Sequence, residues 1–543
     1  MTRSLANMSL SPEHPSITGP SDPEVDPRAS YALEPDMVEA LTDRIIATSG
    51  RTVPSYTPIT GQPVANIPQS TQADVAEAYD RARRAQAAWA RTSLDHRQSV
   101  LLRLHDLVLD RQEEIIDLVC WETGKARKHA YDEVLHVALT ARYYGRTAHR
   151  HLDPERRPGV VPGLTRIDVN HVPKGVVGII APWNYPFTLA VCDGLPALLA
   201  GNAVVTKPDA QTMLTGLLGA QLLEEAGFPR ELWNVVAGPG RELGTPMIER
   251  SDYVCFTGST ATGKIIAAQC AEQLIGCSLE LGGKNPVLVL RDADVDRAAE
   301  GAVRASFSNS GQLCVSTERL FVADQVYDRF VERFVARTEA MRLRNGLGWD
   351  NDMGTLISQD QLDTVTAHVE DAVDKGARVL AGGRARPDLG RFYYEPTILE
   401  GVTPDMTCFG EETFGPVISV YRFHDEADAV SRANEGEYGL NASIYSRDTA
   451  RARQLASQIK CGTVNVNEAF AATFASIDSP MGGMRQSGMG RRQGAEGVHR
   501  YTESQSVATQ RLLRFAPVLG MSDEMYAKVM TANLRLMKKL GRA

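Results

Sequence analysis

The stretch Phe307–Cys314 reads FSNSGQLC and places a cysteine just after a turn that a glycine interrupts. Upstream of it, alanines recur with the spacing of one helix face, at Ala298, Ala302 and Ala305. Downstream, residues 319–322 read RLFV and predict a short buried strand. Gly311 can adopt backbone angles that other residues avoid, so the helix can end there. We therefore expect the Cys314 thiol at the mouth of an α/β unit.

Cys314 has two interpretations when it is considered alone. Most free cysteines are small buried hydrophobes, whereas an activated thiolate is a strong nucleophile toward a carbonyl carbon. Two distant stretches favour the second interpretation: residues 181–186 read APWNYP and residues 279–286 read LELGGKNP. Four shorter motifs accompany them, namely Lys207-Pro208, Phe256–Ser259 (FTGS), Glu412–Pro416 (ETFGP) and Pro480–Gly483 (PMGG).

In this order and at these separations, the motifs resemble the aldehyde dehydrogenase superfamily. The resemblance covers roughly residues 50 to 510, and the chain most resembles bacterial enzymes called succinate-semialdehyde dehydrogenases. It implies a cofactor-binding domain and a catalytic domain, with the active site in the cleft between them. The alternative from another class is a catalytically silent nucleotide-binding scaffold, because a fold alone does not establish a function.

The composition limits the class of protein. The chain has 543 residues, of which 43% are hydrophobic, so it can build large cores. Its net charge of -9, without a dense basic run in the body of the chain, argues against nucleic acid as the main partner. Eight scattered cysteines without a C-x-x-C pair predict neither a disulfide framework nor a metal site. We predict no signal peptide and no integral membrane segment, and we expect a cytoplasmic protein.

Strand and helix patterns alternate along most of the chain. Buried strands are predicted at residues 176–180, 203–206, 233–236, 253–256, 417–420 and 464–467. A helix is predicted at residues 212–225, with Gly227 as its C-cap. This alternation predicts an α/β fold with two doubly wound parallel sheets, to which the resemblance adds a small β oligomerisation element.

The predicted organisation has five parts. Residues 1–35 form a disordered or draped tail that is rich in proline. The cofactor-binding domain takes residues 36–157 and 175–283, and the catalytic domain takes residues 284–497. The oligomerisation element takes residues 158–174 and 498–512, which implies a homodimer or homotetramer. Residues 513–543 form a C-terminal extension.

The C-terminal extension has the pattern of a basic amphipathic helix. Tyr526, Met530, Leu534 and Met537 share one helix face, and lysines and arginines surround them. Such a helix can lie on a membrane surface. We favour packing across a subunit boundary instead, because the rest of the chain is acidic.

Two glycine-rich stretches must be distinguished from nucleotide-binding motifs. Residues 258–264 read GSTATGK, like the start of a P-loop, but Ile265 replaces the Ser or Thr that binds Mg²⁺, so we reject an NTPase. Residues 238–244 read GPGRELG, which is not the Rossmann fingerprint. Ser259 is either a plain N-cap or the first residue of a helix whose N–H groups face an anion.

The resemblance assigns three catalytic residues. Cys314 attacks the aldehyde, and the Asn184 amide together with the Cys314 N–H stabilises the oxyanion. Glu280 is the general base that lets water hydrolyse the thioester. The CoA-acylating branch lacks this carboxylate, so its presence implies release of a free acid. A Schiff base on Lys264 or Lys284 is the rival covalent mechanism, and nothing in the sequence around either lysine favours it.

The resemblance also assigns a cofactor site. Its members are Trp183, Lys207, Ala210, Gly238, Gly258, Ser259, Leu281, Glu412 and Phe414. Relatives that prefer NAD⁺ carry Glu three residues after the lysine, where it repels a 2′-phosphate, and this chain has Ala210 there. We therefore expect NADP⁺ to be preferred or accepted, with NAD⁺ as the second cofactor. Asp209 leaves this expectation open, because a turned backbone could bring its carboxylate into the site.

The substrate is the least determined part of the site. Known members of the succinate-semialdehyde branch hold the substrate carboxylate with two arginines, and the matching positions here are Ser308 and Cys192. The expected substrate residues are Phe187, Val191, Cys192, Ser308, Leu313, Val315 and Phe470. This lining predicts that medium aliphatic or aromatic aldehydes outperform succinate semialdehyde. Succinate semialdehyde stays open as the alternative, with Arg485 as a candidate for its carboxylate.

Overall fold

The computed structural model describes residues 35–160, 165–511, 516–518 and 520–541. They divide into two compact units. The first unit combines the residues up to His151 with Pro173–Tyr501, and the second combines Leu152–Val172 with the residues after Tyr501. Nearly all of the expected N-terminal tail lies outside the described residues.

The first unit begins with a helical region. A hairpin of β1 (Thr52–Tyr56) and β2 (Pro63–Pro68) follows α1 (Pro35–Thr42). The next helices are α2 (Gln72–Trp89), α3 (Leu94–Asp110), α4 (Gln112–Thr123) and α5 (Arg127–Leu152). The apolar periodicity of residues 75–118 predicts a helical region, which corresponds to the first three of these four helices, whereas α5 is an addition. α4 stops at Gly124, whose φ of +69° ends the helix and turns the chain into α5.

A six-stranded sheet follows in the same unit. Its strand order is β17-β9-β8-β5-β6-β7, and all pairs are parallel except β17 with β9. Its strands are β5 (Val176–Ile180), β6 (Ala203–Lys207), β7 (Trp233–Val235), β8 (Tyr253–Thr257), β9 (Gly276–Glu280) and β17 (Gly488–Met489). The connecting helices are α6 (Pro186–Val191), α7 (Gly194–Ala200), α8 (Met213–Ala226), α9 (Gly240–Ile248) and α10 (Thr260–Glu272).

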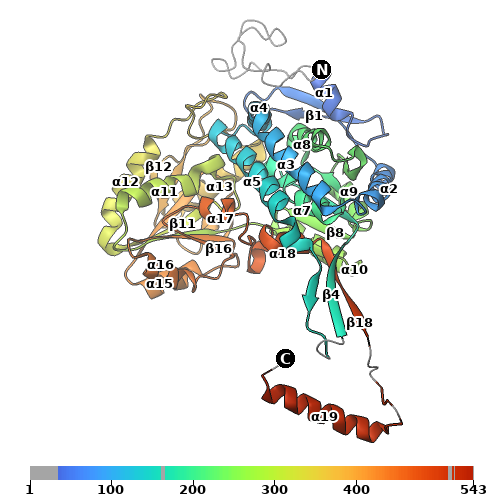
Figure 1. Cartoon of the computed structure of the whole chain (residues 1–543). Coiled ribbons are helices and arrows are strands. Elements are labelled where there is room, and N and C mark those ends of the chain that lie inside the picture. The colour runs from blue at the N-terminus through green and yellow to red at the C-terminus, as the bar shows by residue number, and fades with distance from the viewer. Residues whose placement is uncertain (1–34, 161–164, 512–515, 519, 542–543) are drawn as a thin grey trace. The chain divides into compact units, whose positions relative to one another are not determined.

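A seven-stranded sheet completes the first unit, and Figure 1 shows its elements grouped apart from those of the six-stranded sheet. Its order is β12-β13-β14-β11-β10-β15-β16, with β12 antiparallel to β13 and the other pairs parallel. Its strands are β10 (Asn285–Val289), β11 (Thr317–Ala323), β12 (Arg378–Ala381), β13 (Thr397–Glu400), β14 (Val417–Phe423), β15 (Asn441–Tyr445) and β16 (Thr463–Val466).

Helices connect the strands of this second sheet. They are α11 (Val295–Phe307), α12 (Tyr327–Glu339), α13 (Gln359–Asp374), α14 (Thr407–Gly410), α15 (Glu426–Ala433), α16 (Thr449–Ala456) and α17 (Ala471–Ala475). α18 (Gly494–His499) follows β17. Strands β10 and β11 are buried along their whole length, as expected of parallel strands that are covered on both faces. The two sheets confirm the predicted fold class.

The second unit contains a three-stranded sheet and a helix. The sheet order is β18-β4-β3, with β3 (Glu155–Arg157) antiparallel to β4 (Thr165–Pro173). β18 (Thr502–Gln510) is exposed along most of its length. α19 (Asp523–Lys539) forms where the amphipathic pattern predicts a helix, and none of its residues is buried.

None of the helices among the described residues is long and apolar enough to cross a membrane. No group of three or more His, Cys, Asp or Glu side chains within the described ranges could hold a metal ion.

Candidate active site

Cys314 follows a turn in which three consecutive residues adopt left-handed backbone angles. The φ values are +51° at Asn309, +56° at Ser310 and +71° at Gly311. A Cβ at Gly311 would lie 2.0 Å from the carbonyl oxygen of Gly415, so only glycine fits there. The turn ends α11 and leaves the Cys314 side chain partly exposed.

The surroundings of Cys314 keep its thiol protonated. Burial, followed by the carboxylates of Glu280 and Glu412, raises the pKa of the thiol to about 12. The thiol therefore needs a base or a nearby positive charge to react as a thiolate at neutral pH. The backbone beside it is fixed, because the Asn285 side chain donates hydrogen bonds to the carbonyls of Cys314 and Ser316, both at 2.7 Å.

Glu280 ends β9 and is 6% exposed. Its Oε1 is buried and has no hydrogen-bond partner among the described residues. Burial raises the pKa of this carboxyl to about 7, against opposing contributions from Arg492 and Arg500. A carboxylate whose pKa lies near neutrality and whose oxygen is unpaired suits a general base.

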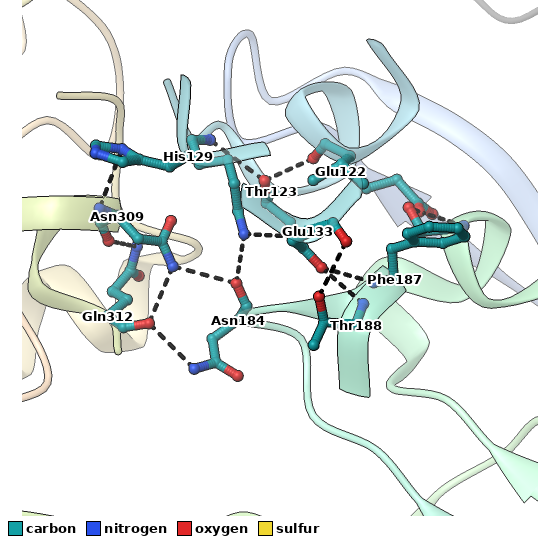
Figure 2. Close-up of polar contacts among 12 residues, drawn as sticks. Glu122, Thr123, His129, Glu133, Asn184, Phe187, Thr188, Asn309 and Gln312 are labelled. Carbon is teal, nitrogen blue, oxygen red and sulfur yellow. Dashed lines mark hydrogen bonds and ion pairs between the residues drawn. The ribbon is translucent and has the colours of Figure 1, made fainter. Parts of the chain in front are cut away.

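Asn184 lies between β5 and α6, close to the turn that precedes Cys314 (Figure 2). Its side-chain Nδ2 donates to the Gln312 carbonyl at 3.1 Å. Its own carbonyl accepts from Lys125 Nζ at 2.7 Å and from Asn309 Nδ2 at 3.1 Å. An amide nitrogen carries two hydrogens, so the contact with Gln312 leaves one for an oxyanion.

Lys207 and Ala210 lie at the end of β6 and in the turn after it. Lys207 is 7% exposed, and its Nζ makes a long contact of 3.4 Å with the Pro208 carbonyl. Burial lowers the pKa of this ammonium. Ala210 is exposed, and Asp209 Oδ1 accepts from the Gln211 N–H at 2.9 Å. The Asp209 carboxylate thus caps the turn.

Glu412, Trp183 and Phe414 form a second part of the expected cofactor site. Glu412 Oε1 accepts from the Gly283 N–H at 2.8 Å, and burial followed by the nearby Glu318 raises the pKa of Glu412 to about 8. The Trp183 and Phe414 rings meet edge to face with 5.5 Å between their centroids. The ring contact brings together two distant motifs of the sequence.

The remaining cofactor candidates lie at three turns. Ser259 is the N-cap of α10 and accepts from the Thr262 N–H at 3.3 Å. Glycine is required by close packing at Gly258 and Gly238, where a Cβ would lie 2.6 Å from the Phe256 ring and 2.8 Å from Leu243. Leu281 is buried and packs against Gly263 of α10.

A cavity of about 900 Å³ opens beside Cys314. Leu313 and Val315, the two neighbours of the cysteine, are part of its wall. Of the expected substrate residues, Ser308, Leu313, Val315 and Phe470 line this cavity. Phe474, on the same loop as Phe470, lines it as well.

Three expected substrate residues do not line the cavity. Phe187, Val191 and Cys192 are buried, and a Cβ at Gly219 of α8 would lie 2.6 Å from Val191. Phe187 and Val191 form part of the contact between α6 and α8, because the apolar face of α6 packs on that helix. Arg485 is also elsewhere, since its guanidinium donates to the carbonyls of Asn434, Gly436 and Tyr438.

Sequence reasoning missed the charged part of the cavity wall. One face of α5 supplies Lys128, His129, Asp132, Leu135, His136 and Leu139. The wall also includes Arg297 and Arg304 of α11, together with Glu468. The spacing of the α5 residues is that of one helix face, which is the signal that could have revealed them. Burial raises the pKa of Asp132 to about 6.

The geometry defines a class of protein: an α/β enzyme with a cysteine nucleophile, an unpaired buried carboxylate and an amide donor around one turn. The family model described as "Aldehyde dehydrogenase family" matches residues 45–507, and the chain belongs to that family. It is therefore an NAD(P)-dependent oxidoreductase that acts on aldehydes.

The chain is also similar to individual members of this family. The chain is 50% identical to the putative succinate-semialdehyde dehydrogenase [NADP(+)] of Mycolicibacterium smegmatis, over 89% of this chain and 93% of that protein. It is 37% identical to the 3-sulfolactaldehyde dehydrogenase of Pseudomonas putida, over 84% of this chain and 94% of that protein. The crystal structure of succinate-semialdehyde dehydrogenase from Burkholderia pseudomallei shares 34% identity and a TM-score of 0.82, over 86% of this chain and 95% of that one.

Proposed function

We propose that this enzyme oxidises succinate semialdehyde to succinate with NADP⁺, through a thioester on Cys314. The observation that carries the chemistry is the proximity of the Cys314 thiol to the unpaired, buried Glu280, whose charge raises the pKa of the thiol. The names of several relatives support the substrate and the cofactor. Asn184 is the third catalytic residue and donates a hydrogen bond to the oxyanion.

Each catalytic residue has a defined task in this proposal. The Cys314 thiol gives its proton to the Glu280 carboxylate, which passes it to solvent, and the sulfur bonds to the aldehyde carbon. The carbonyl oxygen gains the negative charge that Asn184 stabilises. Bound NADP⁺ would supply the acceptor for the hydrogen and two electrons that leave the substrate carbon. A thioester then links Cys314 to the product. Glu280 removes a proton from water, and the resulting hydroxide cleaves the thioester and returns the Cys314 sulfur as the leaving group.

The residues present fit a phosphorylated dinucleotide. Lys207 is a buried ammonium whose one hydrogen bond to the protein is long, so an anionic ligand would improve its environment. Ala210 offers no carboxylate that would repel a 2′-phosphate, and Asp209 is engaged with the backbone of its own turn. The N-terminus of α10 at Ser259 would hold the pyrophosphate.

The cavity supports a substrate with a charged end. Arg297 and Arg304 lie on its wall and could hold a carboxylate, although Arg304 already forms an ion pair with Glu468. A second candidate function, oxidation of medium aliphatic or aromatic aldehydes, is favoured by the apolar residues Leu313 and Phe470. The carboxylate of Asp132 also favours it, because Asp132 repels an anion.

Assembly and domain division are part of the same proposal. Residues 36–157 and 175–283 would bind the cofactor, and residues 284–497 would carry the nucleophile. The exposed strand β18 supports a role for residues 158–174 and 498–512 in a homodimer or homotetramer, since an open sheet edge can pair with another copy. The cytoplasm is the location we propose.

The deciding experiment measures NADPH or NADH formation by the purified enzyme. Succinate semialdehyde, hexanal and benzaldehyde are each compared with NADP⁺ and NAD⁺ as kcat/KM. The proposal requires succinate semialdehyde with NADP⁺ to be the best pair, and an advantage of tenfold or more for hexanal would select the second candidate. Cys314→Ala should abolish oxidation and leave cofactor binding intact, and activity above trace level would refute the covalent mechanism.

A further inference from the structure

A buried ion pair that sequence reasoning did not assign to the site holds the backbone of Asn184. Lys125 lies in the short link between α4 and α5, and the side chains of Lys125 and Glu133 are both 0% exposed. Lys125 Nζ lies 2.6 Å from Glu133 Oε1 and 2.7 Å from the Asn184 carbonyl oxygen. The same ammonium lies over the ring of Tyr185, 3.9 Å from its centroid.

Glu133 anchors the other side of the same segment. Its Oε2 accepts hydrogen bonds from the N–H groups of Phe187 at 2.9 Å and Thr188 at 3.0 Å (Figure 2). The pair therefore holds the backbone on both sides of Tyr185: Lys125 binds the Asn184 carbonyl, and Glu133 binds the first turn of α6. Both carboxylate oxygens and the ammonium are satisfied, which is the condition for a buried pair to be tolerated.

Further hydrogen bonds connect this held segment to the side-chain amide of Asn184. Asn309 Nδ2 donates both to the Asn184 carbonyl at 3.1 Å and to the Gln312 carbonyl at 3.0 Å. The Asn184 side chain donates to that same Gln312 carbonyl at 3.1 Å. With its carbonyl fixed by Lys125 and Asn309, Asn184 has one preferred direction for its remaining N–H.

We propose that Lys125 and Glu133 are positioning residues that aim the Asn184 amide at the oxyanion formed on attack by Cys314. The proposal rests on the proposed function, because it assumes that Asn184 stabilises an oxyanion. An oxyanion donor acts only when it is aimed in advance at the place where charge develops. A displacement of the loop by a fraction of a bond length weakens that hydrogen bond in the transition state more than in the ground state.

The test uses a variant that removes the pair without leaving a buried charge. Lys125→Met with Glu133→Gln keeps the side-chain volumes close to those of the native pair and is neutral. The matched control neutralises the neighbouring pair of Arg127 and Asp117, which also joins α5 to α4 and does not touch Asn184. The control is Arg127→Met with Asp117→Asn.

The measured quantity is the rate constant of NADPH formation in the first turnover. It is expressed per active site, and active sites are counted as the Cys314 thiols that react with the aldehyde. We expect the rate constant to fall by about 10²-fold in the Lys125/Glu133 variant, within the range for loss of an oxyanion donor. Cofactor binding and the KM for the aldehyde should change less than threefold. The control pair should keep the native rate constant.

A purely structural role predicts a different result, namely fewer active sites with an unchanged rate constant per site, and that result would overturn the proposal. Coupling to Asn184 is tested by adding Asn184→Ala to both backgrounds. If the ion pair acts through Asn184, its removal has little further effect once the amide is gone. Effects that multiply instead would also overturn the proposal. Absence of oxidation by the native enzyme with every aldehyde would contradict the proposed function itself.

Discussion

Glu280→Gln should remove the pH dependence of thioester hydrolysis. With a pKa of about 7, about 9% of the Glu280 side chain is ionised at pH 6 and about 91% at pH 8. Only the ionised form can accept a proton from water. When hydrolysis limits turnover, the native rate should therefore rise about tenfold between pH 6 and pH 8. The variant should be slow and nearly independent of pH, and it should accumulate the acylated enzyme.

Burial of Glu280 also predicts a change in stability. The pKa is raised in the folded state from 4.5 to about 7, so the folded chain holds a proton that the unfolded chain has lost within this window. Glu280 therefore lowers the free energy of unfolding by about 3 kcal/mol as the pH rises from about 4.5 to about 7. Glutamine does not titrate, so the Glu280→Gln variant avoids this fall. Its free energy of unfolding relative to that of the native chain should therefore increase as the pH rises over the same window.

The assay combines steady-state rates from pH 6 to 8, mass spectrometry of the acylated chain, and urea unfolding at pH 5 and pH 8. Glu272→Gln, which changes an exposed carboxylate at the end of α10, is the matched control. A native rate that stays flat across this range, or a variant that keeps the native profile, would refute the assignment of Glu280 as the base. A stability difference that does not change with pH would refute the argument from burial.

Three further variants test other parts of the site and the chain. Ala210→Glu restores a carboxylate beside Lys207 and should shift the ratio of kcat/KM from NADP⁺ toward NAD⁺ by about tenfold; Ala210→Gln, the neutral control, should not. Asp132→Asn should raise kcat/KM for succinate semialdehyde relative to hexanal about fivefold, equivalent to about 1 kcal/mol. An unchanged ratio would show that Asp132 does not meet the far end of the substrate. Deletion of residues 521–543 should lower oligomer stability in sedimentation at decreasing concentration. Loss of liposome binding with unchanged assembly would support the membrane alternative instead.

The sequence predicts seven of the thirteen strands in the two large sheets, because parallel strands bury both faces and read as continuous apolar runs. The strand at residues 253–256, for example, became β8. The helix α5 was missed because polar residues interrupt its buried apolar stripe. His129, Glu133 and His136 are buried among the apolar residues of the same helix. Periodicity detects faces that are uniformly apolar, and a buried face that contains polar residues breaks the pattern.

The substrate pocket shows a second limit of the sequence. Phe187 and Val191 follow Asn184 closely, and their apolar character suits a tunnel as well as a core. The structure turns them toward α8, where Gly219 leaves room for close packing. Sequence proximity to a catalytic residue does not determine direction, because successive helical residues point to different sides. His136 shows the reverse case, since it is distant in sequence yet stacks on Phe474 at the cavity.

The antiparallel strand β17 adds a constraint on biosynthesis. Gly488 pairs with Glu280, and the Leu281 N–H donates to the Ser487 carbonyl at 2.9 Å. The ribosome therefore makes the backbone support of the base roughly two hundred residues after the base itself, about 10 to 40 s later at usual rates of synthesis. A chain that stops before residue 488 already contains Cys314 and Asn184. Such a truncated chain contains the nucleophile but lacks the strand that pairs with the backbone of the base. The backbone pairing of Glu280 thus depends on translation of nearly the whole message.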